Sequence, residues 1–550
     1  MTGPAARIAP RPQPEGDPAS FVVMGWGGPG GITPYGLARR SLGSQVLWLF
    51  GVSASAPMTV LAGGTVATFA ATGVIAVPLS FPLLAVALGL FAIGYTRLAR
   101  DVPHAATFAA LLTHGLGRTV GAAAAFVAVL SYNCVQIGLY GLLGATLAGQ
   151  LGGPWWGWAL AAWTVVAVIG YRGVTLGAPV VAVVLTLELG MIVLFDVVAL
   201  THPAQTDAGA WLQPWSPDLL AVDGVGGVLA FGVAAFLGFE TTAAFGEEVR
   251  SDRSVGRATG MCLAFLGVFY GISAWALAVA VGPDHIVDAA RDPGSGIPFS
   301  VLATGLGPFG PLAVTAGVTL LAGSVLGAMI ALHQVVARYV YALGRERVVP
   351  RALAFVSSPH DNSLRTGRRH HLAPPGQYTP KRRRRRRSGG VPIGGSATQS
   401  ALALVVIVAA GLLGLDPIAT VFTELVTLSA LGLLTLMTGT CVAVIAYYRS
   451  PERTAQDRPT WWIRCGAPAL GGLALATALA VTVANLGPTL ADPSGVAPFL
   501  LPLLVVAAAV AGGQRARWLR RHDPDAWQRL GRGRPAPLAL RDVVVADLEL

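Results

Sequence analysis

The chain has 550 residues, of which 54% are hydrophobic and only 12% are charged, and its formal net charge is +11. Soluble domains carry roughly 25% charged residues, so this composition excludes an ordinary soluble protein. Seven of the positive charges form one run, Lys381 to Arg387, and the others mostly border apolar segments. The basic balance therefore indicates anchoring of membrane-spanning helices and not a nucleic-acid partner.

Residues 1–44 are rich in proline and glycine with scattered charge, which predicts a disordered cytoplasmic N-terminus. They show no pattern of a removed signal peptide. The apolar stretches that follow are each long enough to cross about 30 Å of hydrocarbon. We predict twelve spans, at residues 46–70, 75–98, 119–149, 155–171, 176–201, 226–248, 257–282, 309–342, 397–415, 417–447, 462–487 and 496–514. Spans one and two and spans nine and ten are closely spaced, so eleven and thirteen spans are the alternative counts.

The arginines test this count, because basic residues concentrate in cytoplasmic loops. They gather before span one and after every even-numbered span: Arg39, Arg40, Arg97, Arg100, Arg118, Arg172, Arg250, Arg253, Arg257, Arg338, Arg345, Arg347, Arg351, Arg449, Arg453, Arg458, Arg515, Arg517, Arg520 and Arg521. In the alternate loops 202–225, 283–298 and 488–495, the only arginine or lysine is Arg291. This alternation predicts a multi-pass protein with both termini in the cytoplasm.

An unusual basic segment separates spans eight and nine. Residues 358–396 are crowded with arginine, histidine, proline and glycine, a composition that predicts a disordered cytoplasmic loop in contact with water or anionic lipid headgroups. A nuclear-targeting or nucleic-acid role and a sequence artefact are the alternatives. The segment divides the membrane region into residues 45–357 and 397–514, and residues 515–550 are expected to form a cytoplasmic tail.

Three local patterns carry a family resemblance. The end of span eight, residues 337–350, reads ARYVYALGRERVVP; residues 238–240 and 246–250 read GFE and GEEVR; and residues 108–118 read FAALLTHGLGR. They are similar to the ARxxxALGRDGxxP, GFE…GEE.R and FYxYxxxGLGR segments of permeases of the amino acid–polyamine–organocation (APC) superfamily. The resemblance runs from about Gly43 to Gly533. The third segment departs from the family at Ala106, Ala109 and Leu111, where glycine and tyrosines are usual.

The resemblance implies an all-α integral membrane protein with about 12 transmembrane helices in a LeuT-like, five-plus-five inverted repeat. Helices 1 and 6 of that fold are discontinuous at mid-membrane, and their freed backbone groups bind substrate and coupling ions. Residues 51–57 of span one, Gly-Val-Ser-Ala-Ser-Ala-Pro, fit such a break because proline disrupts the preceding turn. Residues 238–242 of span six, Gly-Phe-Glu-Thr-Thr, occupy the matching position.

The two breaks suggest how an amino acid would be held. A helix restarting near Ala54–Ala56 would offer N–H groups to an α-carboxylate, and carbonyls near Phe236–Gly238 would accept from an α-ammonium. Phe236 and Phe239 are candidates for an aromatic lid, with ordinary packing as the alternative. Asn133 and Gln136 share one face of span three with Tyr140, as pocket lining or interhelical contacts. The candidate substrate-binding residues are Ser53, Ala54, Ser55, Ala56, Asn133, Phe236, Leu237, Gly238 and Phe239.

Acidic residues inside apolar spans are costly and usually mark ion or proton paths. Glu188 lies midway along span five, Glu240 at the span-six break and Glu424 near the start of span ten. Glu188 and Glu240 are our candidates for proton coupling, although Glu240 alternatively braces the broken helix. Ser324 and the span-one carbonyls would suit sodium instead. Asp196 and His333 lie nearer helix ends and are interpreted as interfacial or structural.

We therefore interpret the protein as a secondary active transporter of the cell membrane that moves amino acids by alternating access, with proton symport as the expected coupling. Its partners are a small-molecule substrate, a proton or sodium ion and the lipid bilayer, and no cofactor or metal is expected. A polyamine or other organocation transporter and an amino acid exchanger remain open. A membrane-embedded enzyme would need clustered nucleophiles or metal ligands, and no HExxH, GxSxG or P-loop is present. A transporter-like sensor is the other remote alternative.

Overall fold

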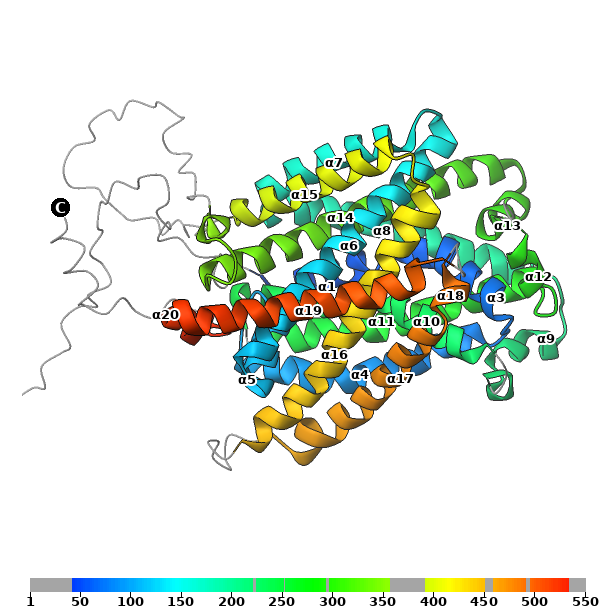
Figure 1. Cartoon of the computed structure of the whole chain (residues 1–550). Helices are drawn as coiled ribbons and strands as arrows, with labels where there is room; N and C mark the ends of the chain where they lie inside the picture. Colours follow the sequence, from blue (N-terminus) through cyan, green and yellow to red (C-terminus); the bar gives the residue numbers. More distant parts are fainter. Residues whose placement is uncertain are drawn as a thin grey trace, which may run out of the picture.

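The computed structural model describes residues 42–220, 224–251, 253–292, 296–356, 391–450, 459–490 and 495–533. The predictions for the N-terminus, for most of the basic loop and for the end of the C-terminal tail lie outside these residues. Within them the chain is a bundle of long helices that run roughly along one common direction (Figure 1).

Eleven helices in the described part of the chain are long and apolar enough to cross a membrane. They are Ser44–Thr72, Val77–Asp101, Arg118–Leu151, Gly177–Thr201, Gly227–Glu248, Ser254–Val281, Gly307–Arg345, Ile393–Leu412, Pro417–Arg449, Trp462–Ala484 and Ala497–His522. Each coincides with one of the twelve predicted spans. The chain is thus an all-helical, multi-pass membrane protein.

The remaining predicted span, span four, corresponds to α7 (Trp155–Arg172). This helix has 18 residues, among them four tryptophans and a terminal arginine, which lower its mean hydropathy. It packs beside α15 (Ile393–Leu412) at the edge of the bundle (Figure 1). Its outer face exposes Trp156, Val168 and Tyr171, a surface suited to lipid and its interface with water.

Two predicted boundaries differ from the structure by four residues or more. α15 begins at Ile393, before the predicted start of span nine at residue 397. The last span, α19 (Ala497–His522), continues past residue 514 through a polar, arginine-rich stretch. Arginine and glutamine favour helix, so α19 extends beyond its apolar part; α20 (Pro524–Arg529) follows it.

Short helices mark the inverted relation of the two halves. In the first half, α5 (Thr107–Leu116) lies between α4 (Val77–Asp101) and α6 (Arg118–Leu151). In the second half, α13 (Ile297–Gly305) lies between α11 (Ser254–Val281) and α14 (Gly310–Arg345). α5 and α13 are at opposite ends of the molecule (Figure 1). The same element in the same chain order but at the opposite end is what an inverted repeat requires.

Hydrogen bonds join the loops that were predicted to share one side. The N–H of Ala105, after span two, donates to Glu247 at the end of span six. The N–H of Gly531, after span twelve, donates to Glu346 at the end of span eight. Leu42, just before span one, donates to the Glu248 carbonyl at this same end. The arginine-rich loops therefore meet at one end of the bundle, which we call the basic end.

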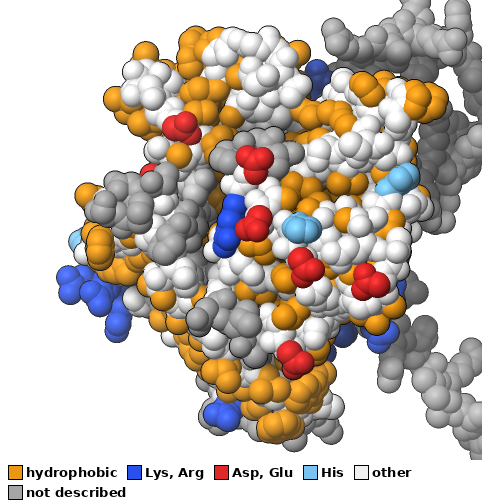
Figure 2. Space-filling view, turned by 90° about the vertical axis from the view of Figure 1, so that its right-hand side faces the viewer, with side chains coloured by type: hydrophobic (Ala, Val, Ile, Leu, Met, Phe, Trp, Pro, Cys, Tyr) orange, Lys and Arg blue, Asp and Glu red, His pale blue; other side chains and the backbone are white. Residues whose placement is uncertain are grey.

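The opposite end carries the arginine-poor loops. Ala204, after span five, donates its N–H to the Val279 carbonyl near the end of span seven. The Arg291 guanidinium, before span eight, donates to the Ala70 carbonyl near the end of span one. Figure 2 views this end and shows acidic side chains scattered over it. The structure thus separates the two sets of loops as the arginine pattern predicts.

Candidate functional site

Span one is interrupted at Ser55 and Ala56. α1 (Ser44–Ala54) ends there, Ala56 adopts a left-handed conformation with a φ of +50°, and α2 (Pro57–Thr59) restarts the span. A π-helical stretch, η2 (Val60–Thr65), then leads into α3 (Val66–Thr72). Pro57 suits the first position of a restarting helix because no N–H has to be satisfied there. The predicted discontinuity of helix 1 is confirmed.

Span six is interrupted at Leu237 and Gly238. α10 (Val225–Phe236) ends before them, and the chain continues as a 3-10 helix, η5 (Phe239–Glu248). Gly238 has a φ of +123°, which side chains rarely permit, and a Cβ atom there would lie 2.8 Å from Ala54 C and Ser55 N. The two breaks therefore lie against each other at mid-bundle, and this backbone contact requires glycine at position 238.

The hydrogen bonding at the first break differs from the prediction. The sequence suggested unpaired N–H groups near Ala54–Ala56, but Ser55 donates to the Val52 carbonyl at 3.2 Å and Ala56 donates to the Ser53 carbonyl at 3.1 Å. These local bonds close the end of α1. The helix restart, with its positive dipole end, lies further along the chain, at Pro57.

Glu188 lies at that restart. It is 1% exposed on α8 (Val174–Thr201), and its Oε1 accepts from the Met58 N–H at 2.7 Å and from the Ser324 hydroxyl at 2.5 Å. Met58 belongs to the first turn after the break, where a negative group is favoured by the helix dipole. The Glu188 carboxylate thus occupies the kind of position that the sequence assigned to a substrate carboxylate, and it joins spans one, five and eight.

Glu240 holds the second break. One carboxylate oxygen accepts from the Gly238 N–H at 2.8 Å, and the other accepts from the Tyr132 hydroxyl at 3.2 Å. The Tyr95 hydroxyl donates to the Glu240 main-chain carbonyl at 2.8 Å. The Gly238 carbonyl, predicted to be free, accepts from the Thr241 hydroxyl at 2.6 Å. These contacts match the bracing alternative for Glu240.

The aromatic candidates for a lid are part of the core in this conformation. Phe236 and Phe239 are fully buried; Phe236 packs against Tyr270, with ring centroids 6.0 Å apart, and Phe239 meets Phe91 edge-on at 6.1 Å. The other predicted binding residues are buried as well: Ser53, Ala54, Ser55, Ala56, Asn133, Leu237 and Gly238. The predicted site is therefore closed.

Asn133 and Gln136 have different roles in the structure. The Asn133 amide donates to the carbonyl of Val129 on its own helix, and its oxygen has no partner among the described residues. Gln136 instead belongs to a buried polar cluster with His333, Ser396 and Gln399, which links α6, α14 and α15. Of the two roles predicted for Gln136, pocket lining and interhelical contact, the structure shows the interhelical contact. The sequence interpretation missed this cluster, because its members are far apart in the chain.

The other intramembrane acids lie elsewhere. Asp196 is buried on α8 and accepts from the Ser273 hydroxyl of α11 at 3.0 Å, which matches a structural role. Glu424 is half-buried at the end of a π-helical stretch, η9 (Pro417–Glu424). Of the four acids, Glu188 and Glu240 are the two that bond to the broken helices.

Two segments that carried the family resemblance meet at the basic end. Arg338 forms two hydrogen bonds with Glu248, of 2.6 and 3.2 Å, and its guanidinium lies 4.4 Å from the centre of the Phe245 ring. Arg345 forms two more with Glu247, of 2.7 and 2.9 Å. The end of span six is thus fastened to the end of span eight by paired charges, a contact that closes this end of the bundle.

Comparison with known proteins supports these observations. The sequence matches the family model described as amino acid permease over residues 45–510. The structure is similar to that of the Eremococcus coleocola manganese transporter solved with an aromatic bis-isothiourea substituted compound, with a TM-score of 0.53 and 11% identity over 90% of this chain and 100% of that chain. At this identity the likeness shows the fold alone. No curated protein matches the sequence.

Proposed function

Because the chain belongs to the amino acid permease family of the APC superfamily, and is therefore a membrane transporter, we propose that it moves amino acids across the cell membrane by alternating access, in symport with protons. The observation that carries the proposal is the Glu188 carboxylate at the restart of span one, hydrogen-bonded to Met58. The arginine pattern further supports a cytoplasmic location for the basic end, and hence for both termini.

The position of Glu188 links proton and substrate. While ionised, its carboxylate accepts from Met58 and supplies the negative charge that the helix end favours. An α-carboxylate of a substrate would compete for the same place. Protonation of Glu188 removes its charge and leaves the Met58 N–H and the positive helix end to the substrate. Proton and substrate then bind together, and loss of the proton expels the substrate, which is the reciprocal coupling that symport requires.

The rest of the substrate would contact the second break. An α-ammonium suits main-chain carbonyls of Phe236 and Leu237, which flank the interruption of span six beside Ala54. The unpartnered Asn133 oxygen is a further candidate acceptor, once the site opens. Because Phe236 and Phe239 fill the core here, they have to move apart to admit a side chain. Substrate binding is therefore coupled to rearrangement of the two breaks.

An organic cation is the second candidate substrate. The observation that favours it is that Glu188 and Glu240 accept hydrogen bonds only from amides and hydroxyls in the described contacts, without a basic partner. A polyamine or related amine would supply the missing positive charge. The manganese cargo of the structural neighbour is not carried over, because the likeness extends to the fold alone.

The test is uptake of labelled amino acids and polyamines into proteoliposomes under an imposed pH or sodium gradient. An inside-alkaline gradient is expected to drive concentrative uptake of an amino acid by the wild-type protein. Glu188→Gln should still exchange substrate but lose the response to the pH gradient. Glu240→Gln, whose amide oxygen can still accept from Gly238, is the matched control and should remain coupled.

Several outcomes would contradict this assignment. Gradient-driven accumulation by Glu188→Gln would remove Glu188 from the coupling mechanism. Uptake that responds only to a sodium gradient would show that sodium is the coupling ion in place of the proton. The Ser324 hydroxyl, which contacts Glu188, would then be a candidate ligand of the ion. Transport of polyamines without amino acids would select the second candidate. Uptake only into liposomes preloaded with substrate would identify an exchanger.

A further inference from the structure

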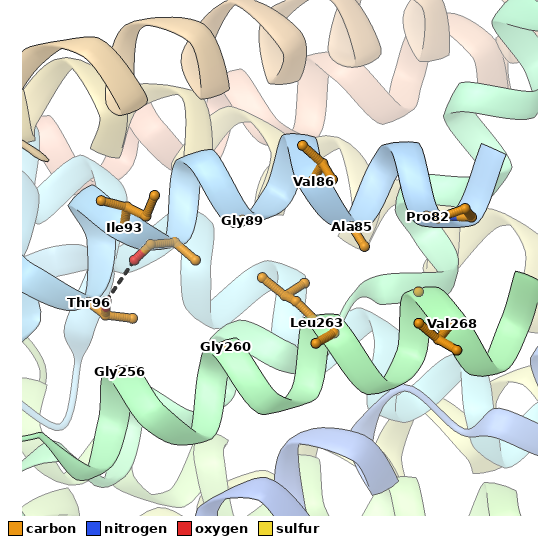
Figure 3. A pocket seen from close by; sticks show the side chains of 13 residues that line it. Pro82, Ala85, Val86, Gly89, Ile93, Thr96, Gly256, Gly260, Leu263 and Val268 are labelled. Atoms are coloured by element: carbon orange, nitrogen blue, oxygen red, sulfur yellow. Dashed lines mark hydrogen bonds between the residues drawn. The ribbon is translucent and has the colours of Figure 1, made fainter. Parts of the chain in front are cut away.

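A groove runs along the outside of the bundle between α4 and α11 (Figure 3). It has a volume of about 440 Å³ and is lined almost wholly by apolar side chains and glycines. The rims include Val86, which is 65% exposed, and Val268, which is 60% exposed. The groove is separate from the site at the helix breaks, because none of its lining residues belongs to that site.

The groove exists because the two antiparallel helices touch at its ends and part between them. At one end a Cβ on Gly267 would collide with Ala85, and at the other a Cβ on Gly256 would lie 3.4 Å from the Thr96 hydroxyl. Between these contacts, a Cβ on Gly260 would meet no atom within 4 Å. The missing side chain at Gly260 therefore leaves space that the protein itself does not fill.

Three arginines lie beyond the basic end of the groove. On α4 the lining positions recur every three or four residues up to Thr96, and Arg100 continues the same helical face. On α11 the lining begins at Gly256, and Arg253 and Arg257 lie on the extension of its face. All three arginines are exposed, and within the described residues none of them forms an ion pair.

The start of α11 adds to this positive charge. α11 is 28 residues long, and no side chain caps its first turn. The Ser254 N–H donates to the Ser251 carbonyl, but the dipole of the helix still favours an anion beside Arg253 and Arg257. An apolar groove that opens at its end onto three arginines and the positive end of a helix dipole is complementary to a molecule with an apolar tail and an anionic head.

We propose that this groove binds an anionic phospholipid from the cytoplasmic leaflet. One acyl chain lies between α4 and α11 over Gly260, and the phosphate is held by Arg100, Arg253 and Arg257. Residues 82–96 of α4 extend about 21 Å at 1.5 Å per residue. One leaflet contributes about half of a hydrocarbon core of about 30 Å, so the groove is long enough for an acyl chain with its headgroup at the arginines.

The arginines also decide against a second copy of the chain as the occupant. A symmetric dimer with its axis along the membrane normal would place the same residues of both copies at the same depth. The two sets of Arg100, Arg253 and Arg257 would then face each other across the interface. Like charges brought together in this way oppose association, whereas an anionic phosphate offsets part of their charge.

The experiment is native mass spectrometry of the full-length protein purified in detergent and titrated with phosphatidylglycerol or phosphatidylcholine. Wild-type protein is expected to retain one phosphatidylglycerol at lipid concentrations at which phosphatidylcholine is lost. Gly260→Leu fills the groove and should weaken this binding at least tenfold. Arg100→Gln combined with Arg257→Gln should weaken phosphatidylglycerol binding by about tenfold and remove the preference over phosphatidylcholine.

Two variants serve as matched controls. Gly190→Leu makes the same substitution at an exposed, open glycine of α8, and Arg517→Gln with Arg521→Gln removes two exposed arginines from α19. Both should bind as wild type. The proposal is overturned by equal binding of the two lipids, by unchanged binding in Gly260→Leu, or by a dimer that Gly260→Leu dissociates. Normal lipid binding by these controls would show that the loss of binding in the groove variants comes from the substituted positions. None of these outcomes depends on the transported substrate.

Discussion

Glu346 illustrates how a buried carboxylate can be satisfied without an arginine. Its Oε1 accepts from His104 Nε2 at 2.8 Å and from the Gly533 N–H at 3.2 Å, and its Oε2 accepts from the Gly531 N–H at 3.1 Å. The Ala106 N–H donates to His104 Nδ1, which fixes the orientation of the ring. Hydrogen bonds from amides to a carboxylate are charge-assisted and therefore strong. Glu188 and Glu240 follow the same pattern with Met58 and Gly238.

Replacement of Glu346 should have a pH-dependent effect on stability. Burial alone would raise the pKa of the Glu346 carboxyl, but His104 and the Gly531 and Gly533 amides outweigh burial and hold this pKa below its ordinary value. A lowered pKa stabilises the folded state above the ordinary value of about 4.3, and this contribution is lost as the pH falls through the folded-state pKa.

We therefore expect Glu346→Gln to lower the thermal stability of the purified protein at pH 7, by about 2 kcal/mol. The difference from wild type should shrink as the pH is lowered below about 4. Melting curves over this range provide the measurement, with Asp525→Asn at an exposed position of α20 as the control. A difference that stays constant with pH would show that the ionised carboxylate is not the stabilising species.

At the scale of elements, the sequence predicted that two helices break but not how they end. Pro57 and the glycine at 238 are local signals, so they could be read directly. The partners of the breaks could not, because Glu188 is 130 residues from Met58 in the chain. The prediction that the N–H groups of Ser55 and Ala56 are unpaired is wrong because α1 ends in local turns that bond them. The sequence does not show these turns.

The junction of η5 and α14 gives the clearest test at this scale. Arg338 and Glu248 are 3% and 5% exposed at their side chains and form the paired contact described above. Glu248→Ala leaves a buried, uncompensated arginine, so we expect a loss of about 3–5 kcal/mol. The double variant Glu248→Leu with Arg338→Met should be less destabilised than Glu248→Ala, because neither charge then remains. The free energies of unfolding of the wild type and of the two variants test this order.

A matched surface pair is available as the control. Arg291 and Asp288 are 56% and 82% exposed and 3.6 Å apart, and an exposed pair of this kind contributes about 0–1 kcal/mol. Asp288→Ala should therefore leave stability nearly unchanged. Equal effects of Asp288→Ala and Glu248→Ala would mean that burial of the Arg338 pair has no energetic consequence.

For the whole molecule, the periodic arginines predicted the arrangement of loops, which does not depend on side-chain packing. Eleven of the twelve predicted spans satisfy the length and hydropathy of a membrane helix. α7 falls short in mean hydropathy because its 18 residues include four tryptophans and a terminal arginine. The buried polar cluster around His333 was beyond prediction, since it is assembled from three helices. The same limitation applies to the groove between α4 and α11.

The orientation of the bundle can be tested by cysteine labelling in intact cells. Thr206 is exposed at the arginine-poor end and Arg520 at the basic end. With the half-buried Cys465 replaced by serine, we expect Thr206→Cys to react with a membrane-impermeant maleimide from outside. Arg520→Cys should react only after permeabilisation. The reverse pattern would place the basic end outside the cell and refute the proposed topology.

The contacts of Glu346 also have a consequence for biosynthesis. A chain is made from its N-terminus, so His104 and Glu346 are synthesised well before Gly531 and Gly533. Until the final helices are inserted and α20 has emerged from the ribosome, the carboxylate lacks two of its three donors. Completion of the contacts of Glu346 is therefore a late event in assembly, later than the pairing of Arg338 and Arg345 with the end of span six. A nascent chain that stalls before residue 531 would expose this acidic group to the quality-control machinery of the cell.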